Sequence, residues 1–204
     1  MYHPIKESDM LDLAAYQDEL RKTPVLRYLF LELTDRCNLN CIHCGSKCTE
    51  NNRTYLEYSI IEKTLSRVAD KYNPAEIMIC ITGGEPFLHP DVYRIIQFSR
   101  NLGFSVGITS NGTLIGTKQA KALKQTGLNT IAISIDGIGE VHNSLRGSAH
   151  AFEKAMKGCW NLKHAGIEPQ ALTVVHKDNL FQLEEIFEFL DAEGFYSWRL
   201  VNID

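Results

Sequence analysis

Short apolar runs alternate with longer helical patterns along most of this chain, and this alternation constrains the fold most strongly. The apolar runs are residues 25–34, 76–82, 104–109, 130–135, 170–175 and 197–203. Helical patterns separate them at residues 59–72, 91–102, 117–126, 151–165 and 179–193. Strands that alternate with helices form β/α units around a parallel sheet. We therefore expect an α/β fold, a partial (β/α)6 TIM-like barrel, since a complete eight-unit barrel needs about 250 residues.

The two ends of the chain differ from this pattern. Residues 1–24 are polar with scattered leucines, and Leu11 to Lys22 fit one amphipathic helix that Pro24 ends. We predict a helical extension over 1–24 and one core domain over 25–204. The chain stops directly after the sixth predicted strand, which leaves a sheet edge uncovered. We expect the barrel to be truncated there, or to be one domain of a longer protein.

Two helices carry a start signal typical of a capping box. Ser59 is followed three residues later by Glu62, and Asn179 is followed by Gln182. Such pairs satisfy the first amide groups of a helix. They predict that the helices of the first and fifth units begin at these positions.

Composition and cysteine use indicate the compartment. Of the 204 residues 44% are hydrophobic and 23% charged, and the net charge is −4. This balance gives no general attraction to nucleic acid or to an anionic membrane. No run is long enough to span a bilayer, and the N-terminus has no apolar core typical of a signal peptide. Six cysteines, three of them clustered, fit a reducing cytosol better than a disulfide framework. We expect a cytoplasmic protein.

Three of these cysteines follow the first predicted strand closely. Cys37, Cys41 and Cys44 have the spacing C-x3-C-x2-C, which can wrap one metal centre. A structural zinc takes four protein ligands, and an iron–sulfur cube is usually held by four cysteines. Three thiolates on a cube leave one iron open for catalysis. Cys48 follows after three more residues, so four thiolates closing a zinc or electron-transfer site remains an alternative.

Polar and glycine-rich segments follow the next strand. In parallel α/β folds, functional groups gather at the carboxyl ends of the strands. Gly83, Gly84, Glu85 and Pro86 follow the second strand. The two glycines allow the backbone to approach a ligand closely, and Glu85 can accept a hydrogen bond from an ammonium group. A simple Gly-Gly turn is the alternative.

The third and fourth strands end in short polar side chains. Ser110 and Asn111 can bond a ribose, or can form an Asn-Gly turn with the following glycine. Ser134 and Asp136 end the fourth strand, and Arg146 follows ten residues after Asp136. An arginine matches a carboxylate bidentately.

The cysteine loop and the GGEP segment together resemble the radical S-adenosylmethionine (SAM) enzymes. The stretch SIDG at 134–137, followed by His142 and Arg146-Gly147, resembles members that carry a C-terminal SPASM or twitch domain. The resemblance implies that Cys37, Cys41 and Cys44 hold a [4Fe-4S] cluster whose open iron chelates SAM.

By the same resemblance, the remaining polar segments would contact parts of SAM. Residues Gly83 to Pro86 would hold its amino group, and Ser134 with Arg146 would hold its carboxylate. Ser110 and Asn111 would contact the ribose, and Asp136 belongs to the same candidate site. Val175, at the end of the fifth strand, and His43 would lie against the adenine.

The resemblance also implies a reaction. The reduced cluster donates one electron to SAM, which splits into methionine and a 5′-deoxyadenosyl radical that abstracts hydrogen from a substrate. A peptide or protein side chain is the expected substrate, and flavodoxin or ferredoxin the expected reductant.

The alternative is a non-enzymatic metal module in which Cys48 completes four thiolates. Cys80, within the second predicted strand, is expected to be a small core residue, and Cys159 is expected to be a packing residue of the fourth helix.

Overall fold

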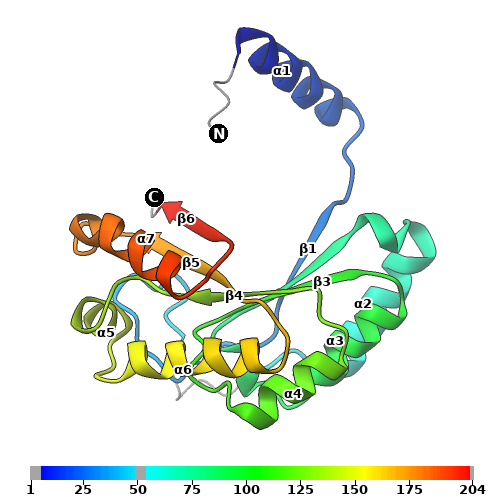
Figure 1. Ribbon diagram of the computed structural model, residues 1–204. Coiled ribbons are helices and arrows are strands. Elements are labelled where there is room, and N and C mark those ends of the chain that lie inside the picture. Colours follow the sequence, from blue (N-terminus) through cyan, green and yellow to red (C-terminus); the bar gives the residue numbers. More distant parts are fainter. Residues whose placement is uncertain (1–5, 49–53, 203–204) are drawn as a thin grey trace.

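The computed structural model describes residues 6–48 and 54–202, and its centre is one parallel sheet (Figure 1). The strands lie side by side in the order in which they occur in the chain. They are β1 (Tyr28–Glu32), β2 (Met78–Thr82), β3 (Ser105–Ser110), β4 (Thr130–Ser134), β5 (Gln170–Val175) and β6 (Trp198–Asn202). Every neighbouring pair is parallel, which confirms the predicted α/β fold with a partial TIM-like barrel.

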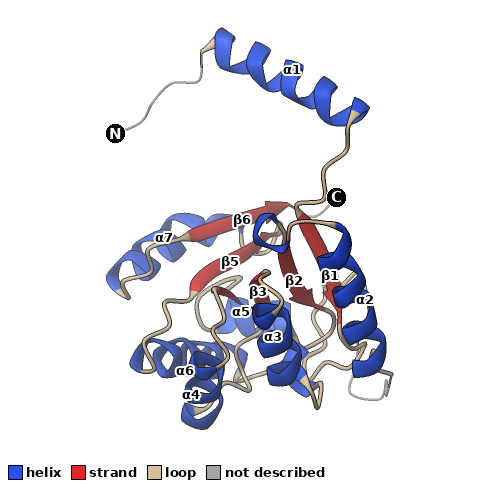
Figure 2. Ribbon diagram, turned by 90° about the vertical axis from the view of Figure 1, so that its right-hand side faces the viewer, coloured by secondary structure: helices blue, strands red, loops and turns tan. Residues whose placement is uncertain are grey.

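Helices cover the outer face of this sheet, and the inner face is concave (Figures 1 and 2). The α-helices are α1 (Glu7–Lys22), α2 (Tyr58–Lys71), α3 (Val92–Asn101), α4 (Thr117–Gln125), α5 (Glu140–Arg146), α6 (Ala151–His164) and α7 (Leu183–Ala192). The short 3-10 helices of the described ranges are η1 (Pro74–Glu76), η2 (Pro86–Leu88) and η3 (Leu180–Gln182). Among the helices of the described ranges, none is both long and apolar enough to cross a membrane.

The core forms between the sheet and the helices, because successive strand residues point to opposite faces. In and just after β1, Leu31 and Leu33 are buried in this core, whereas Tyr28 and Phe30 are 62% and 66% exposed. The main cluster joins β1–β4 to α2, α3, α4 and α6, and a smaller cluster around Ile186 joins α7 to β5. The concave face is therefore left with apolar side chains that the core does not use.

Both predicted capping boxes are wrong. The helix of the first unit, α2, begins at Tyr58, and Glu62 accepts a hydrogen bond from the Tyr58 hydroxyl at 3.3 Å instead of capping through Ser59. Asn179 precedes η3, and its side chain bonds the backbone of β5 and β4, as described below. Sequence spacing alone cannot separate a cap from a tertiary contact, since both use the same polar side chains.

Helix α5 was not predicted, because seven residues are too few to show a helical period. It lies in the segment that we expected to be a long loop between β4 and α6. Gly147, with φ of 64°, ends it in the left-handed conformation that favours glycine.

The first helix differs from its prediction in extent and packing. Helix α1 begins at Glu7 rather than Leu11, and none of its residues is buried. It lies apart from the sheet and is connected to β1 by residues 23–27 (Figure 1). Its apolar residues Met10, Leu13 and Tyr16 are all exposed. The division into an extension and a core domain stays a prediction, and residues 1–5 and the strand end at 203–204 lie outside the described residues.

Candidate active site

One pocket at the carboxyl ends of the first four strands collects most of the predicted site residues. Its volume is about 190 Å³. It is lined by Cys37, Cys41, His43, Cys44, Cys48, Thr82, Gly83, Gly84, Thr109, Ser110, Asn111, Ser134 and Arg146. Of the other predicted residues, Glu85, Pro86 and Asp136 are buried and do not line it. Val175 lines a separate cavity with His176 and Asn202, away from the thiols.

The cysteine loop is held on one side by the GGEP segment. The amide of Gly84 donates to the carbonyl oxygen of Thr34, and the amide of Glu85 to that of Arg36, both at 2.7 Å. A Cβ atom added to Gly84 would lie 2.1 Å from the Arg36 oxygen. We expected glycine here for close approach to a ligand. The approach that the structure shows is to the backbone directly before Cys37.

The other side of the cysteine loop rests on the end of α5. The amide of Ile42 donates to the carbonyl oxygen of Leu145 at 3.0 Å. A Cβ atom on Gly147 would lie 2.4 Å from the Asn40 oxygen. The helix that the sequence did not predict is therefore one of the two supports of the thiol loop.

Glu85 lies in the interior, with 1% of its surface exposed. One carboxylate oxygen accepts from the Ser110 hydroxyl at 2.8 Å and the Phe87 amide at 3.2 Å, and the other from the Asn111 amide at 2.9 Å. Burial raises the pKa of Glu85, while these hydrogen bonds oppose the rise. In this arrangement the carboxylate ties β2 to the end of β3.

Asn111 connects β3 to the cysteine loop. Its side-chain amide donates to Asn38 Oδ1 at 3.0 Å and lies 3.9 Å from the sulfur of Cys37. Asn38 in turn donates to the Thr113 hydroxyl at 2.8 Å. Asn111 therefore orients the loop as well as lining the pocket.

Arg146 and His43 meet the buried carboxylate of Asp136. Asp136 Oδ2 lies 2.6 Å from Arg146 Nη2 and 3.4 Å from His43 Nε2. Arg146 Nη1 lies 3.8 Å from the sulfur of Cys41. Burial alone would lower the pKa of Arg146, but the charge of Asp136 and the neighbouring Cys41 outweigh burial and raise it. The pocket therefore holds a permanent cation beside a thiol.

The thiols themselves are partly buried and free of disulfides. Burial raises the pKa of Cys37 to about 11, and it raises that of Cys41 against the opposing charge of Arg146. Cys48 is 5% exposed and lines the same pocket. A second cavity, of about 410 Å³, is also lined by Cys48. Cys48 therefore lies beside the three-cysteine motif without belonging to its spacing.

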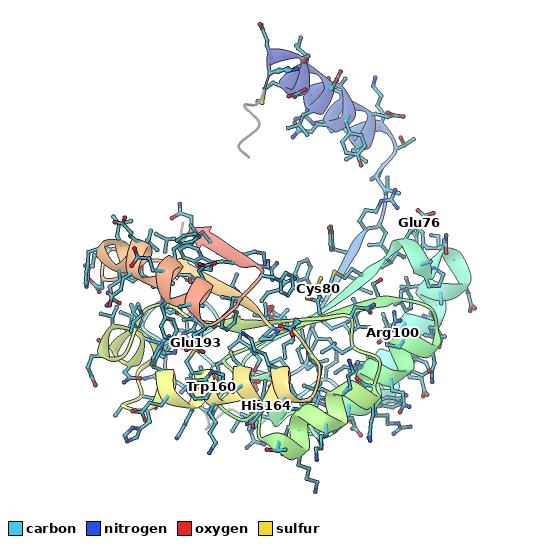
Figure 3. The ribbon with its side chains drawn as sticks, viewed as in Figure 1. Glu76, Cys80, Arg100, Trp160, His164 and Glu193 are labelled. Atoms are coloured by element: carbon cyan, nitrogen blue, oxygen red, sulfur yellow. The ribbon has the colours of Figure 1, made fainter. Side chains whose placement is uncertain are left out.

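The two remaining cysteines differ. Cys159 is buried in α6, as predicted. Cys80 was expected in the core, but it is half-buried on the concave face of the sheet, where Figure 3 labels it. The prediction for Cys80 is wrong because β2 places alternate residues on this open face.

Several contributors to the site were not singled out from sequence. Thr82 and Thr109 line the pocket from β2 and β3, and Asn38 holds Asn111. Asn179 is fully buried and donates to the carbonyl oxygens of Asp136 and Val174. Thr82 and Thr109 could have been predicted as pocket residues because they lie at strand ends. Asn38 and Asn179 do not lie at strand ends, so their positions in the sequence gave no such signal.

The residues present suit a three-thiolate cluster with a bound anionic group. Cys37, Cys41 and Cys44 line one pocket, and three thiolates are one ligand short of a complete cube. Among the described residues they form no group that would hold a single metal ion. Arg146 Nε and His43 Nδ1 are buried polar atoms with no partner among the described residues. These two nitrogens can therefore form hydrogen bonds with a further group bound beside Cys41.

A parallel β/α sheet with three convergent thiols at its carboxyl edge defines the core of an iron–sulfur enzyme. The chain belongs to the radical SAM superfamily, because the model of that family matches residues 31–190. This confirms the resemblance seen in the sequence. Its cofactors are a [4Fe-4S] cluster and SAM. The alternative of a non-enzymatic metal module is not favoured.

The relatives include enzymes named for tetrapyrrole products. The chain is 34% identical over 180 residues to AdoMet-dependent heme synthase of Oleidesulfovibrio alaskensis, with 87% of this chain and 46% of that protein covered. It is 30% identical over 191 residues to Fe-coproporphyrin III synthase of Methanosarcina barkeri, covering 92% and 46%. The chain thus spans about half the length of these relatives.

A solved structure shares the fold. Native anSMEcpe with bound AdoMet and Cp18Cys peptide superposes with a TM-score of 0.75 at 22% identity, covering 88% of this chain and 51% of that one. At this identity the likeness shows the fold alone.

Proposed function

We propose that this chain cleaves SAM at a cluster held by Cys37, Cys41 and Cys44. The observation that carries the proposal is the convergence of these thiols with Arg146 on one pocket. When bound and reduced, the cluster supplies the electron that splits SAM into methionine and a 5′-deoxyadenosyl radical. Flavodoxin or ferredoxin is the proposed source of this electron.

The protein's own part is to bind and orient SAM. The backbone of Gly83 and Gly84 faces the pocket and is proposed to receive the amino group of SAM. Ser134 and Arg146 are proposed to bind its carboxylate, and Ser110 and Asn111 its ribose. His43 is proposed to lie against the adenine. Val175, at the end of β5, is proposed to contact the adenine as well, although it lines a separate cavity with His176 and Asn202.

A cavity on the concave face is the proposed substrate site. It has a volume of about 450 Å³ and shares Thr82 and Thr109 with the thiol pocket. Tyr28, Phe30 and Met78 form much of its apolar lining. Arg199 is the one charged residue among those that line it, and pairs with no carboxylate among the described residues. This combination suits an apolar molecule that carries a carboxylate.

The first candidate substrate is therefore a tetrapyrrole with carboxylate side chains. The names of the two relatives above support this class, and Arg199 supplies a cation for one carboxylate. The second candidate is a peptide or protein side chain. The SPASM-like stretch from Ser134 to Gly147 supports it, as does the sheet order, in which β1 and β6 are the two edges and do not pair with each other among the described residues.

The first experiment measures SAM cleavage. The purified chain is loaded anaerobically with iron and sulfide, reduced, and incubated with SAM. We expect 5′-deoxyadenosine and methionine from the wild type and from a Cys159→Ala control, whose thiol is buried away from the pocket. Cys41→Ala should yield neither product. Equal product from Cys41→Ala would refute the assignment.

The second experiment measures substrate binding. Coproporphyrin III is added to the loaded chain, and its absorption shift is followed. Arg199→Gln should weaken binding about tenfold or more, on the scale of a charge-assisted bond. The control Arg27→Gln removes an exposed arginine that pairs with Glu76. No binding by the wild type, together with modification of a supplied peptide, would favour the second candidate.

A further inference from the structure

Asp136 is a buried charge at the end of β4, and three separate segments meet at its carboxylate. Its exposed fraction is 0%. Oδ2 contacts Arg146 from the end of α5 and His43 from the cysteine loop. Oδ1 accepts from the amide of Val174 in β5 at 2.9 Å. Among the described residues Oδ2 makes these two charge contacts without a hydrogen bond of standard geometry, whereas Oδ1 is hydrogen-bonded. Burying a carboxylate is costly unless it is paired, so the Arg146 contact and the Val174 bond together hold it in place.

The backbone of Asp136 is held as firmly as its side chain. Its amide donates to His142 Nδ1 at 3.0 Å, and its carbonyl oxygen accepts from Asn179 Nδ2 at 2.7 Å. Burial lowers the pKa of His142 to about 3, so this ring is neutral near pH 7 and can accept through Nδ1. The carboxylate therefore has one defined position relative to the sheet.

Arg146 takes its orientation from that position. Arg146 is 8% exposed, and its guanidinium contacts Asp136 through Nη2 and the Cys41 sulfur through Nη1, at 2.6 and 3.8 Å. Within the described residues Asp136 is its one carboxylate partner. Without that partner, a buried cation would tend to move towards water.

We propose that Asp136 is a positioning residue that aims Arg146 at the sulfur of Cys41, rather than a direct contact of SAM. The inference rests on the proposed function, in which Cys41 is a cluster ligand. A cation at a ligand sulfur stabilises the more negative, reduced cluster, since hydrogen bonds and nearby charge set cluster potentials. Arg146 held in this way therefore raises the reduction potential of the cluster.

The direction in which the reduction potential shifts tells whether Asp136 acts by positioning Arg146 or only through its own charge. Asp136→Ala removes a negative charge near the cluster, and this alone would raise the potential. If Asp136 acts by holding Arg146, the same substitution releases the cation and the potential falls. We expect a fall, measured by redox titration of the cluster's electron paramagnetic resonance signal. A rise in Asp136→Ala would overturn the proposal.

A double-mutant cycle tests whether Asp136 acts through Arg146. Arg146→Gln should lower the potential. In that background Asp136→Ala should cause no further fall, because the cation that it positions is gone. A further fall of full size would overturn the proposal. Asp178→Ala is the matched control, because this carboxylate is half-exposed and pairs with His176 outside the thiol pocket.

Two further measurements keep the proposal testable if a variant unfolds or does not bind the cluster. Asp136→Glu keeps the charge while lengthening the side chain, so it should lower the potential less than Asp136→Ala. A rise in Asp136→Glu would overturn the inference. If the wild type binds no iron, the proposed function fails. The cycle is then read from unfolding of the cluster-free chain, where fully additive effects of Asp136→Ala and Arg146→Gln would overturn the positioning role.

Discussion

The amide of Glu85 donates to the carbonyl oxygen of Arg36 at 2.7 Å, one residue before the first cysteine of the motif. This bond and its neighbour from Gly84 to Thr34 attach the thiol loop to the end of β2. The two most distinctive segments of the sequence are therefore a single structural unit. A substitution in the GGEP segment should therefore disturb the cysteine loop, and a substitution in the loop should disturb the GGEP segment.

Gly84→Ala should disturb this unit. The added Cβ would lie 2.1 Å from the Arg36 oxygen, and overpacking of this kind costs about 1–3 kcal/mol. We expect lower stability in urea unfolding and a smaller iron content after reconstitution. Gly45→Ala is the matched control, because nothing lies within 4 Å of its added Cβ. Equal iron content in the two variants would contradict the close approach.

The cysteines of the motif should separate from Cys48. Cys44→Ala should lose the brown chromophore and SAM cleavage, because two thiolates are too few to hold the cluster. Cys48→Ala should retain both, with about four irons per chain, the content of one cube. Iron analysis and the visible spectrum check this. Loss of the cluster in Cys48→Ala would instead indicate a four-thiolate site.

Glu85→Ala should destabilise the chain. Three donors, from Ser110, Asn111 and Phe87, would lose their acceptor, and each orphaned buried donor costs about 1–3 kcal/mol. Thermal unfolding of the cluster-free chain measures this effect. Glu76→Ala, which removes an exposed carboxylate, should leave the melting temperature near that of the wild type. A Glu85→Ala variant as stable as Glu76→Ala would show that the interior contacts contribute little.

His142 should make stability depend on pH in mildly acidic solution. Its folded pKa of about 3 lies below the unfolded value of about 6.5, so the unfolded chain binds more protons in between. Stability should therefore fall as the pH drops below about 6.5, by at most ~1.4 kcal/mol per pH unit from this group. Urea unfolding of the cluster-free chain at several pH values measures the slope.

A substitution separates this slope from that of other groups. His142→Asn keeps an acceptor for the Asp136 amide but does not titrate, so its slope should be smaller. His150→Asn, at an exposed histidine paired with Glu153, should keep the slope of the wild type. An unchanged slope in His142→Asn would mean that this histidine binds protons equally in the folded and unfolded states.

Local pattern was sufficient to predict the strands, most of the helices and the grouping of three thiols at one pocket. Strand periodicity depends on residues two positions apart, and the spacing of Cys37, Cys41 and Cys44 is itself a local property. The parallel sheet follows from the alternation of strands and helices. The place of Ser110, Asn111 and Ser134 at the pocket follows from the rule that strand ends share one edge.

Tertiary structure alone decided how these residues are used. Arg146 and Cys41 are 105 residues apart in the chain, and no local pattern pairs them. Asn179 reads as a helix cap but binds the backbone of Asp136, 43 residues away. Glu85 reads as a ligand for an ammonium group, yet its oxygens bond groups on β3 and η2. A buried polar side chain must take whichever partners the packed chain brings within reach, and this choice depends on segments distant in sequence.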